Sequence, residues 1–469
     1  EMCIRDRAYQ LLRVLAVVLL AWSAWLFVAT FTASREQRRW LFLAVVFGAG
    51  IGWIWNLYRL MNGDYGGLVS DIELLTRPLD LWVPEGYVFY SMLVMPHFSV
   101  AIALLLLTVR YAAIGMAENR LAPTIAAGVL CFALSFVHPY DVLIALGLAG
   151  GVAGLHSLHQ RRLDPAAWRH VGVLLLIGSG PVLYNYWILN SNPGMHAWLV
   201  QNHSASPAPA SYLAGSGLLL LGALLYTLKQ RRELGADLAP RQWLFAWLLI
   251  LPLALYAPID FQRRLVIGAA APLAVLAMLL LLDWLQSRRF GLRHARAATL
   301  AVVIGLVSLS SAFHWLNSFR KANDHAGEMF VDSGLVESLQ AIAGAPADNG
   351  TVLARFATGN HVPRFTGRAT VIGSRGQTGN FDHLLTSTDA FYRGEMSDAG
   401  MKAFLEEQRV DWVVIGPHEA DIMASDLRQR LARLDLQSWY RADDGAYEVL
   451  LRSPLTGRTE ASAKTAVDG

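Results

Sequence analysis

Charged residues are scarce in this sequence. They make up 16% of the 469 residues, whereas 54% of the residues are hydrophobic. Because soluble globular domains carry about 25% charged residues, this deficit excludes an ordinary cytosolic enzyme. Cysteine is scarcer still, since the chain has only Cys3 and Cys131, and this excludes a disulfide framework or a cysteine metal cluster. The long apolar runs that take the place of charge predict a membrane protein.

The charges that are present divide the chain into two regions. Residues 1–319 hold 23 of the 39 Lys and Arg residues and 15 of the 36 Asp and Glu residues, a net charge of +8. Residues 320–469 hold the remainder, a net charge of −5. We therefore predict a transmembrane helical bundle over 8–319 and a separate domain over 320–455. Residues 456–469 lack large apolar side chains, which predicts a disordered tail.

The first seven residues have an unusual sequence. They resemble the heptapeptide that a translated sequencing adapter leaves in an assembled sequence. They have neither an initiator Met at position 1 nor the pattern of a signal peptide. We therefore expect a non-native junction over 1–7 and further native sequence upstream of Ala8.

Apolar stretches long enough to cross a membrane recur along the first region. A helix needs about 20 apolar residues to cross the hydrocarbon core, and it satisfies its own backbone polar groups in lipid. The predicted fold class is therefore mainly α: a polytopic transmembrane helix bundle of about ten spans, followed by a small extracytoplasmic α/β domain. The predicted spans are 9–32, 41–60, 93–112, 121–137, 139–157, 170–190, 211–228, 243–259, 265–284 and 298–316.

The distribution of Lys and Arg between the predicted loops indicates an orientation. Sixteen of these residues lie in loops of one set, and four lie in the opposite set. Because cytoplasmic loops carry the excess of positive charge, the first set is predicted to be cytoplasmic. The other loops and the C-terminal domain then face outward from the inner (cytoplasmic) membrane.

The C-terminal region alternates strand and helix patterns. Leu335, Leu339 and Ile342 recur at helical spacing, and Ser397 is a candidate cap for a helix that runs to Arg409. Further predicted elements are strands at 351–358, 369–374 and 410–416, a helix at 419–434, and a hairpin of 438–442 and 446–452 around the turn 443–445. Strands that alternate with helices indicate an α/β domain.

Three polar groups interrupt the apolar pattern, and the first surrounds Pro139. Ionisable residues between two apolar runs are costly unless they face a cavity. Pro139 breaks the helical hydrogen bonds and allows His138, Tyr140 and Asp141 to gather at one turn. One interpretation is a polar floor to a substrate cavity. The other is a re-entrant helical hairpin in which the His–Asp pair satisfies itself.

The second group lies in the predicted outward loop 61–97. Asp80 and Glu85 are the preferred acids, since two prolines and a tryptophan lie beside them, and His97 follows near the membrane interface. A carboxylate here is a candidate general base toward a hydroxyl acceptor. The alternative is a solvated loop with ordinary charges, including Asp64 and Asp71.

The third group is Gln262, Arg263 and Arg264, which breaks the positive-inside pattern with two adjacent arginines in a very short outward loop. Guanidinium groups match phosphate oxygens in two-pronged geometry, so we predict that these residues bind a lipid phosphate. The alternatives are contact with headgroups or pairing with Asp260. His156 and His159 lack a third ligand, and we predict no metal site.

Together these features resemble the bacterial GT-C superfamily of membrane glycosyltransferases, near the protein mannosyltransferase and aminoarabinose transferase type. The resemblance rests on the bundle, the acidic loop, residues 95–97, 137–141 and 262–264, and the outward α/β domain with the run 355–360. It implies a sugar donor on a polyprenyl phosphate and transfer to an extracytoplasmic glycan, lipid or protein acceptor, with no nucleic acid partner.

The resemblance also implies an acidic residue in the first outward loop, as general base or as contact to a divalent metal ion. No position of this sequence matches that residue, so we expect the principal base upstream of residue 8. Asp80 and Glu85 are then weak catalytic candidates, His97, His138, Tyr140 and Asp141 are cavity residues, and Gln262, Arg263 and Arg264 contact the lipid phosphate. The competing interpretation is a non-catalytic protein, such as a flippase or transporter of a lipid-linked sugar or an envelope-assembly scaffold.

Overall fold

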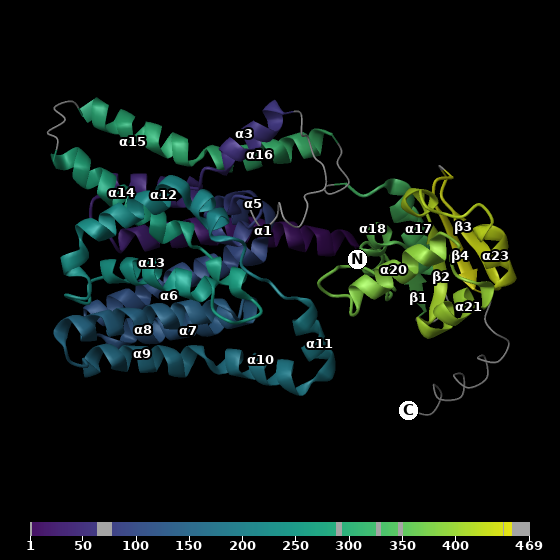
Figure 1. Cartoon of the computed structure of the whole chain (residues 1–469), viewed down its shortest axis with the longest axis horizontal. Coiled ribbons are helices and arrows are strands. Elements are labelled where there is room, and N and C mark those ends of the chain that lie inside the picture. Colours follow the sequence, from purple (N-terminus) through teal and green to yellow (C-terminus); the bar gives the residue numbers. More distant parts are fainter. Residues whose placement is uncertain are drawn as a thin grey trace. The chain divides into compact units, whose positions relative to one another are not determined.

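The computed structural model describes residues 2–62, 77–287, 293–324, 330–345, 350–443 and 445–452. The chain divides into two compact units. The first comprises Glu1–Leu199 and His203–Arg320, and the second comprises Val200–Asn202 and Lys321–Gly469. Figure 1 shows helices throughout the first unit and all of the described strands in the second. The predicted fold class, a mainly helical bundle followed by a small α/β domain, is confirmed.

The first unit is built from helices joined by short connections. Two of its 3₁₀ helices, η2 and η4, precede the short helix α5 and the long helix α14 respectively. The elements are α1 Met2–Ala29, α2 Arg35–Phe47, α3 Gly52–Met61, η1 Leu79–Leu81, η2 Pro84–Gly86, α5 Val88–Val94, α6 Pro96–Ala117, α7 Leu121–Val137, α8 Asp141–Gln160, α9 Pro165–Gly178, α10 Gly180–Ser191, α11 Pro193–Gln201, α12 Pro209–Lys229, η3 Arg231–Glu233, α13 Arg241–Leu255, η4 Gln262–Val266, α14 Ala270–Ser287, α15 Arg293–Val307 and α16 Leu309–Asn323.

Between five and eight candidate membrane spans lie in this unit. Five helices are long and apolar enough alone, and three bent pairs qualify if each pair is one span: α2 with α3, α9 with α10, and α15 with α16. The bends are 47°, 52° and 54°, and α7 and α13 are apolar but shorter. Each of the ten predicted stretches falls on one of these helices or pairs.

The bends have local causes. Pro181 stands at the start of α10, where a missing N–H is tolerated. At the break between α2 and α3, Gly50 packs against the backbone of α12, and a Cβ on Gly50 would collide with the carbonyl oxygen of Gly215. Glycines are therefore required where these two spans touch.

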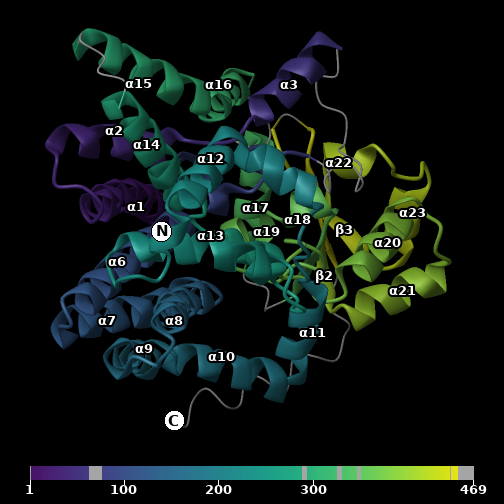
Figure 2. The same cartoon turned by 60° about the vertical axis from the view of Figure 1, so that its left-hand side comes forward.

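The bundle core is formed by buried aliphatic and aromatic side chains. Helix α6 packs against α1 and α7, and α12 packs against α14, an arrangement visible in Figure 2. Trp243, Phe245 and Trp247 of α13 are almost fully buried. Polar residues are accommodated where helices begin and end, since those positions free backbone groups for other partners.

The second unit is a four-stranded mixed sheet with helices on both faces. The strand order is β1-β2-β4-β3, with β1 parallel to β2 and the other pairs antiparallel. One core contains α17 side chains, and the other contains side chains of α20, α21 and α23. The elements are α17 Ser333–Gly344, β1 Thr351–Leu353, α18 Phe356–Gly359, α19 Val362–Thr366, α20 Phe381–Tyr392, α21 Asp398–Glu407, β2 Val410–Ile415, α22 Pro417–Ala420, α23 Leu427–Arg433, β3 Leu436–Arg441 and β4 Glu448–Arg452.

Several predicted elements of this unit are confirmed. The side chain of Ser397 caps α21 by accepting a hydrogen bond from Gly400 N at 3.1 Å. Leu335, Leu339 and Ile342 are buried on one side of α17. The hairpin of β3 and β4 is present, although Asp444 of its turn lies outside the described residues, as do the tail 456–469 and Asp64 and Asp71 of the acidic loop.

Three predicted elements are wrong, because their backbone groups form hydrogen bonds with other partners or pair only briefly with the sheet. The strand predicted at 351–358 stops at Leu353, since Glu419 accepts the hydrogen bond of Arg355 N. The stretch 369–374 makes a single bridge, between Thr370 and Val352. The helix predicted at 419–434 is divided into α22 and α23, with Ala424 N donating to Tyr392 O between them.

Candidate functional site

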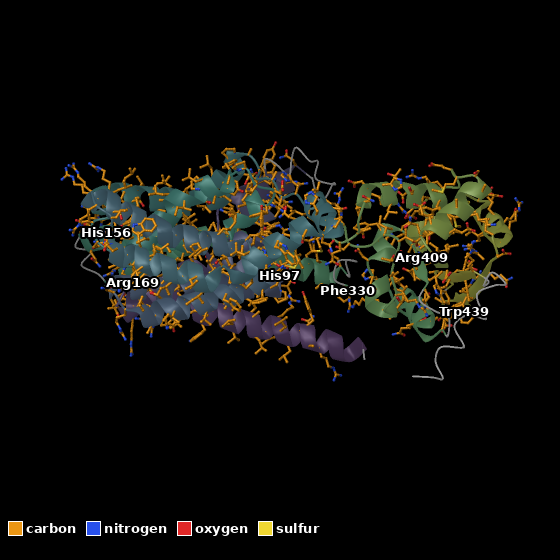
Figure 3. The ribbon with its side chains drawn as sticks, turned by 90° about the horizontal axis from the view of Figure 1, so that it is seen from below. His97, His156, Arg169, Phe330, Arg409 and Trp439 are labelled. Carbon is orange, nitrogen blue, oxygen red and sulfur yellow. The ribbon has the colours of Figure 1, made fainter. Side chains whose placement is uncertain are left out.

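Four breaks of the bundle lie close together and carry most of the predicted site residues. They are η2 with Glu85, the start of α6 with His97, the turn between α7 and α8 with His138 and Tyr140, and η4 with the two arginines. His97 lies at the opposite end of the bundle from His156 and Arg169 (Figure 3). The group, called the polar cluster here, therefore lies away from the arginine-rich loops.

The arginine pair of the polar cluster rests on aromatic rings. The guanidinium carbon of Arg263 lies 4.8 Å from the ring centre of Trp82, and that of Arg264 lies 5.5 Å from the ring centre of Tyr140. Arg264 Nε also donates to Ser204 Oγ at 3.3 Å. Such stacking fixes the planes of the guanidinium groups. Arg263 Nε is buried and has no hydrogen-bond partner among the described residues.

Asp260 does not provide the alternative partner for these arginines. Its carboxylate contacts His203, with Oδ1 and Nδ1 3.2 Å apart. Gln262 holds the loop instead: Gln262 Oε1 accepts from Ser206 N at 3.1 Å, and Gln262 Nε2 donates to Ala257 O at 2.7 Å. The loop thus presents the arginines, while the amide of Gln262 is occupied by backbone groups.

Glu85 is the buried acid nearest to the arginine pair. It is 6% exposed, and its carbonyl oxygen accepts a hydrogen bond from Gly268 N at 2.8 Å, which ties η2 to the segment after η4. Its carboxylate interacts electrostatically with Arg263 and with Asp141. Asp141 also interacts electrostatically with Arg264, so two carboxylates and two guanidinium groups share the cluster.

His138 and Asp141 form a buried pair across the turn between α7 and α8. Their Nδ1 and Oδ1 atoms are 2.9 Å apart, and the two residues are 5% and 0% exposed. His138 lies edge-to-face with Phe98 and Tyr140, at 5.6 and 5.3 Å between ring centres. The pairing anticipated by the self-satisfying interpretation is present, yet His138 Nε2 and Asp141 Oδ2 have no hydrogen-bond partner in the described part of the chain.

Asp80 belongs to a different polar group, at the break between α2 and α3. Its Oδ2 accepts from Gly52 N at 3.1 Å, and His314 Nε2 lies 2.7 Å from its carbonyl oxygen. The His314 ring stacks on Tyr90. Burial raises the pKa of Asp80 to about 6, although hydrogen bonds from Ser310 and the backbone oppose the rise. These contacts give Asp80 a role in joining three helices.

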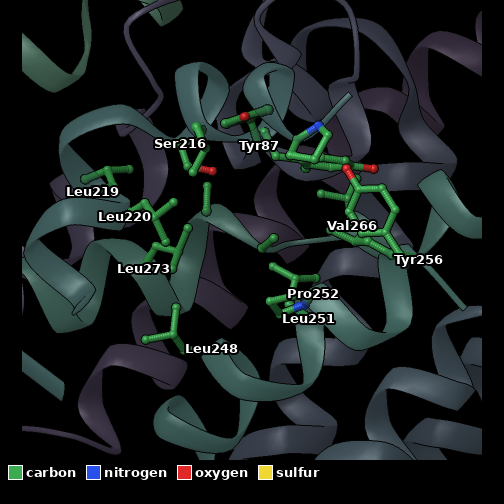
Figure 4. Close-up of a pocket in the computed structure, with 17 residues that line it drawn as sticks. Tyr87, Ser216, Leu219, Leu220, Leu248, Leu251, Pro252, Tyr256, Val266 and Leu273 are labelled. Atoms are coloured by element: carbon green, nitrogen blue, oxygen red, sulfur yellow. The ribbon is translucent and has the colours of Figure 1, made fainter. Parts of the chain in front are cut away.

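A cavity of about 200 Å³ opens beside the polar cluster. Figure 4 shows its wall of leucines from α12, α13 and α14, with Tyr87 and Tyr256 at one side. The lining residues are Gly86, Tyr87, Pro209, Tyr212, Leu213, Ser216, Leu219, Leu220, Leu248, Leu251, Pro252, Leu255, Tyr256, Val266, Ala269, Ala270 and Leu273. Gly86 directly follows Glu85, and Tyr212 interacts electrostatically with Glu85 and Arg263. An apolar chamber thus adjoins a cationic group.

No sequence motif predicted this cavity, because its walls are ordinary apolar spans. Two irregularities of those spans are the available signals. Pro252 stands inside α13, and Gly217 has a left-handed backbone conformation, φ +46°, inside α12. Each interrupts helical hydrogen bonding, and Ser216 and Pro252 both line the cavity.

No three His, Cys, Asp or Glu side chains within the described ranges are grouped closely enough to hold a metal ion. The ligand set implied by a divalent metal is thus not offered by the polar cluster, where Asp141 is engaged with His138 and Glu85 interacts with Arg263. We assign no step of the chemistry to a metal ion.

Comparisons with known proteins find distant similarity to solved structures of an archaeal protein. No protein-family model matches the sequence, and no curated protein matches it. The oligosaccharyltransferase of Archaeoglobus fulgidus, solved with zinc and sulfate, is similar at a TM-score of 0.45 and 12% identity, over 94% of this chain and 61% of that one. Its apo form gives 0.45 and 12%, over 95% and 63%. AglB of the same organism, in complex with an inhibitory peptide and a dolichol-phosphate, gives 0.41 and 11%, over 94% and 74%.

This chain therefore spans 61–63% of the length of the first two structures. The chemistry available to it is that of its own side chains. The arginine pair has the chemistry to bind a phosphate, and the cavity has the lining to receive a hydrocarbon chain. One imidazole nitrogen and one carboxylate oxygen of the polar cluster have no hydrogen-bond partner in the described part of the chain.

Proposed function

We propose that this chain is an integral membrane glycosyltransferase, which moves a sugar from a polyprenyl-phosphate carrier to an extracytoplasmic acceptor. The observation that carries the proposal is the adjacency of two features. A pair of arginines stacked on aromatic rings adjoins an apolar cavity of about 200 Å³. A polyprenyl phosphate joins the same two chemistries, an anion and a branched hydrocarbon, in one molecule.

The arginines supply the anionic half of this recognition. Hydrogen bonds between guanidinium and phosphate are charge-assisted, and the fork of Arg matches two phosphate oxygens at once. Arg263 Nε is buried without a described partner, and buried polar groups left in that state call for a ligand or water. During transfer the phosphate gains negative charge as the bond to the sugar breaks, and fixed cations stabilise that charge.

The cavity supplies the apolar half. Its lining is almost wholly aliphatic, with the hydroxyls of three tyrosines and a serine. The tyrosine hydroxyls are used within the fold: Tyr87 donates to Gly215 O at 2.6 Å, and Tyr256 donates to Pro207 O at 2.9 Å. Each methylene of a lipid buried in such a chamber contributes about 0.8 kcal/mol.

The proposed location is the inner (cytoplasmic) membrane, with the polar cluster near its outer face. The arginine-rich loops that mark a cytoplasmic side lie at the bundle end opposite His97 (Figure 3). A lipid-linked sugar on the outer leaflet would then reach the arginine pair from within the bilayer. The acceptor is a glycan, lipid or protein hydroxyl of the cell envelope.

The experiment measures binding and turnover with the purified chain in nanodiscs. Undecaprenyl phosphate is the binding probe, and polyprenyl-phosphate hexoses and pentoses are the donor panel, with release of free polyprenyl phosphate as the readout. Arg263→Ala is expected to weaken binding about 10- to 100-fold, the loss of charge-assisted hydrogen bonds. Arg162→Ala, at an exposed arginine of the opposite end, is the matched control.

The outcomes separate the competing classes of protein. Release of polyprenyl phosphate by the wild type, lost in Arg263→Ala, supports the glycosyltransferase. Binding without release from any donor favours the flippase, transporter or scaffold and contradicts the proposed activity. Equal affinity of the wild type and Arg263→Ala for undecaprenyl phosphate would show that Arg263 does not bind the phosphate.

A further inference from the structure

The turn between α7 and α8 holds an imidazole in a single orientation. His138 N donates to Leu134 O at 2.8 Å and closes α7, and Asp141 N donates to His138 O at 3.2 Å and opens α8. Pro139 between them has no N–H to continue the helix. The backbone thus sets the His138 and Asp141 side chains three residues apart on one turn, and the rings of Phe98 and Tyr140 enclose the imidazole.

The contact with Asp141 determines where the imidazole carries its proton. With Asp141 ionised, its carboxylate only accepts hydrogen bonds, and Nδ1 of His138, 2.9 Å from Asp141 Oδ1, is then the donor. A neutral imidazole then has its lone pair on Nε2. Nε2 is buried and has no hydrogen-bond partner among the described residues. Among the described residues, two acceptor atoms of the pair therefore have no hydrogen-bond partner, Oδ2 of Asp141 and Nε2 of His138, and Nε2 is the one on the imidazole.

This atom lies near the proposed phosphate site. Tyr140 contacts both the His138 ring and the Arg264 guanidinium group, at 5.3 and 5.5 Å from its ring centre. The ionisable groups that face the pair are His97 from α6, Glu85 from η2 and Arg264 from η4. A single aromatic ring thus separates the imidazole from the cation that would hold the leaving phosphate.

The other candidate bases are engaged. Glu85 interacts with Arg263, and a carboxylate beside a guanidinium is a poor proton acceptor. Asp80 accepts from Gly52 N and lies in the group that joins α3 and α16. At the ends of α6, α7 and α8, His138 is the buried imidazole that is held at Nδ1 by a carboxylate and has no hydrogen-bond partner at Nε2 among the described residues.

We infer that His138 accepts the proton of the acceptor hydroxyl, and that Asp141 is its positioning residue; this inference rests on the proposed glycosyltransferase function. The hydroxyl oxygen forms a bond to the anomeric carbon of the sugar, and the bond from that carbon to the phosphate oxygen breaks. The electron pair leaves with the phosphate, and the hydroxyl proton moves to Nε2. The imidazolium keeps its Nδ1–H hydrogen bond to Asp141 and then releases the proton to water.

The test compares three variants of the full chain in nanodiscs. His138→Gln is expected to slow release of polyprenyl phosphate about 10²- to 10⁴-fold, the usual contribution of a general base, and to leave undecaprenyl phosphate binding within about threefold. Asp141→Asn is expected to shift the pH profile of the rate, because Nδ1 loses its charged acceptor. His170→Gln is the matched control: His170 is also buried and bonded, to Thr124, and no change in rate is expected.

Chemical rescue separates a base from a structural histidine. Imidazole added to His138→Gly is expected to restore part of the rate, which a merely structural role would not allow. A His138→Gln rate within about threefold of the wild type would overturn the inference, even where the wild type transfers sugar and the proposed function stands. Absence of rescue together with an unchanged pH profile in Asp141→Asn would also overturn it. Failure of the wild type on every donor would instead contradict the proposed function and remove the basis of the inference.

Discussion

Arg355 of the second unit and Arg263 of the first unit stand in contrasting surroundings. Arg355 donates to both oxygens of Asp389, at 2.9 and 3.3 Å, and to His418 O at 2.6 Å. The adjoining Glu419 is fully buried and accepts from Arg355 N and Gly416 N at 2.9 and 3.0 Å. Arg263 lies over the ring of Trp82, and its buried Nε has no hydrogen-bond partner among the residues that the structure describes.

The difference indicates which arginine is available to a ligand. The carboxyl ends of parallel strands such as β1 and β2 often receive anions, but here the side chain of Glu419 already takes up the backbone N–H groups. The network around Arg355 therefore stabilises the fold. In the polar cluster, by contrast, several buried polar atoms have no partner within the described ranges, as the proposed function requires of a ligand site.

The largest expected effect is on the satisfied network. Glu419→Ala leaves two backbone N–H groups without acceptors and removes two charge-assisted hydrogen bonds, so the free energy of unfolding of the second unit should fall by about 3–5 kcal/mol. Chemical unfolding followed by tryptophan fluorescence measures this change. Glu395→Ala, at an exposed acid, should change stability by less than about 0.5 kcal/mol, and binding of undecaprenyl phosphate should be unaffected by either. An unchanged unfolding midpoint for Glu419→Ala would show that the network around Arg355 and Glu419 does not stabilise the second unit.

Asp80 provides an intermediate case, because its Oδ2 accepts a hydrogen bond from Gly52 N whereas its buried Oδ1 has no hydrogen-bond partner among the described residues. Its pKa rises from 3.8 to about 6 on folding, so the folded state binds more protons than the unfolded state between these values. Stability should therefore decrease as the pH rises from 4 to 6, by up to about 3 kcal/mol. Asp80→Asn keeps an acceptor for Gly52 N and should abolish this decrease. Thermal unfolding between pH 4 and 8 measures this decrease in stability, with Glu36→Gln as control. The same pH dependence in Asp80→Asn as in the wild type would show that Asp80 does not cause it.

Arg263→Lys sharpens the contrast between the two arginines. Lysine keeps the charge but lacks the planar fork and the stacking on Trp82. We expect undecaprenyl phosphate to bind about tenfold more weakly, the loss of roughly one charged hydrogen bond, with stability unchanged. Calorimetric titration measures the affinity. Full affinity in the lysine variant would mean that charge alone is recognised.

The smallest expected effect tests the cavity. Ala270→Phe places a ring in the chamber beside the polar cluster and should weaken binding of undecaprenyl phosphate about three- to tenfold, since fewer lipid methylenes are buried. A two-isoprene phosphate should bind as well as before. Leu221→Phe, on an exposed face of α12, is the control. Equal weakening for long and short lipids would place the hydrocarbon chain elsewhere.

The sequence was most informative where lipid or proline limits the choice of structure. Apolar length predicts the helices because the bilayer core accepts little else, and Pro139 predicts the turn that pairs His138 with Asp141. Asp80 and Glu85 were equivalent from the sequence, yet they belong to different polar groups, because each depends on a helix distant in the chain. The divided helix at 419–434 and the cavity could not be predicted, because both depend on tertiary contacts. The helix is divided where Ala424 N donates to Tyr392 O, and the cavity forms where α12, α13 and α14 face one another.

The contact between Gly50 and Gly215 has a consequence for how the bundle is made. The two glycines lie in spans separated by most of the bundle sequence, and the chain is synthesised from the N-terminus onward. The break between α2 and α3 therefore lies in the membrane without its contact to Gly215 until α12 has been inserted. The contact between Gly50 and Gly215 can therefore form only after α12 is in the membrane. The same holds for the cavity wall that Ser216 of α12 lines.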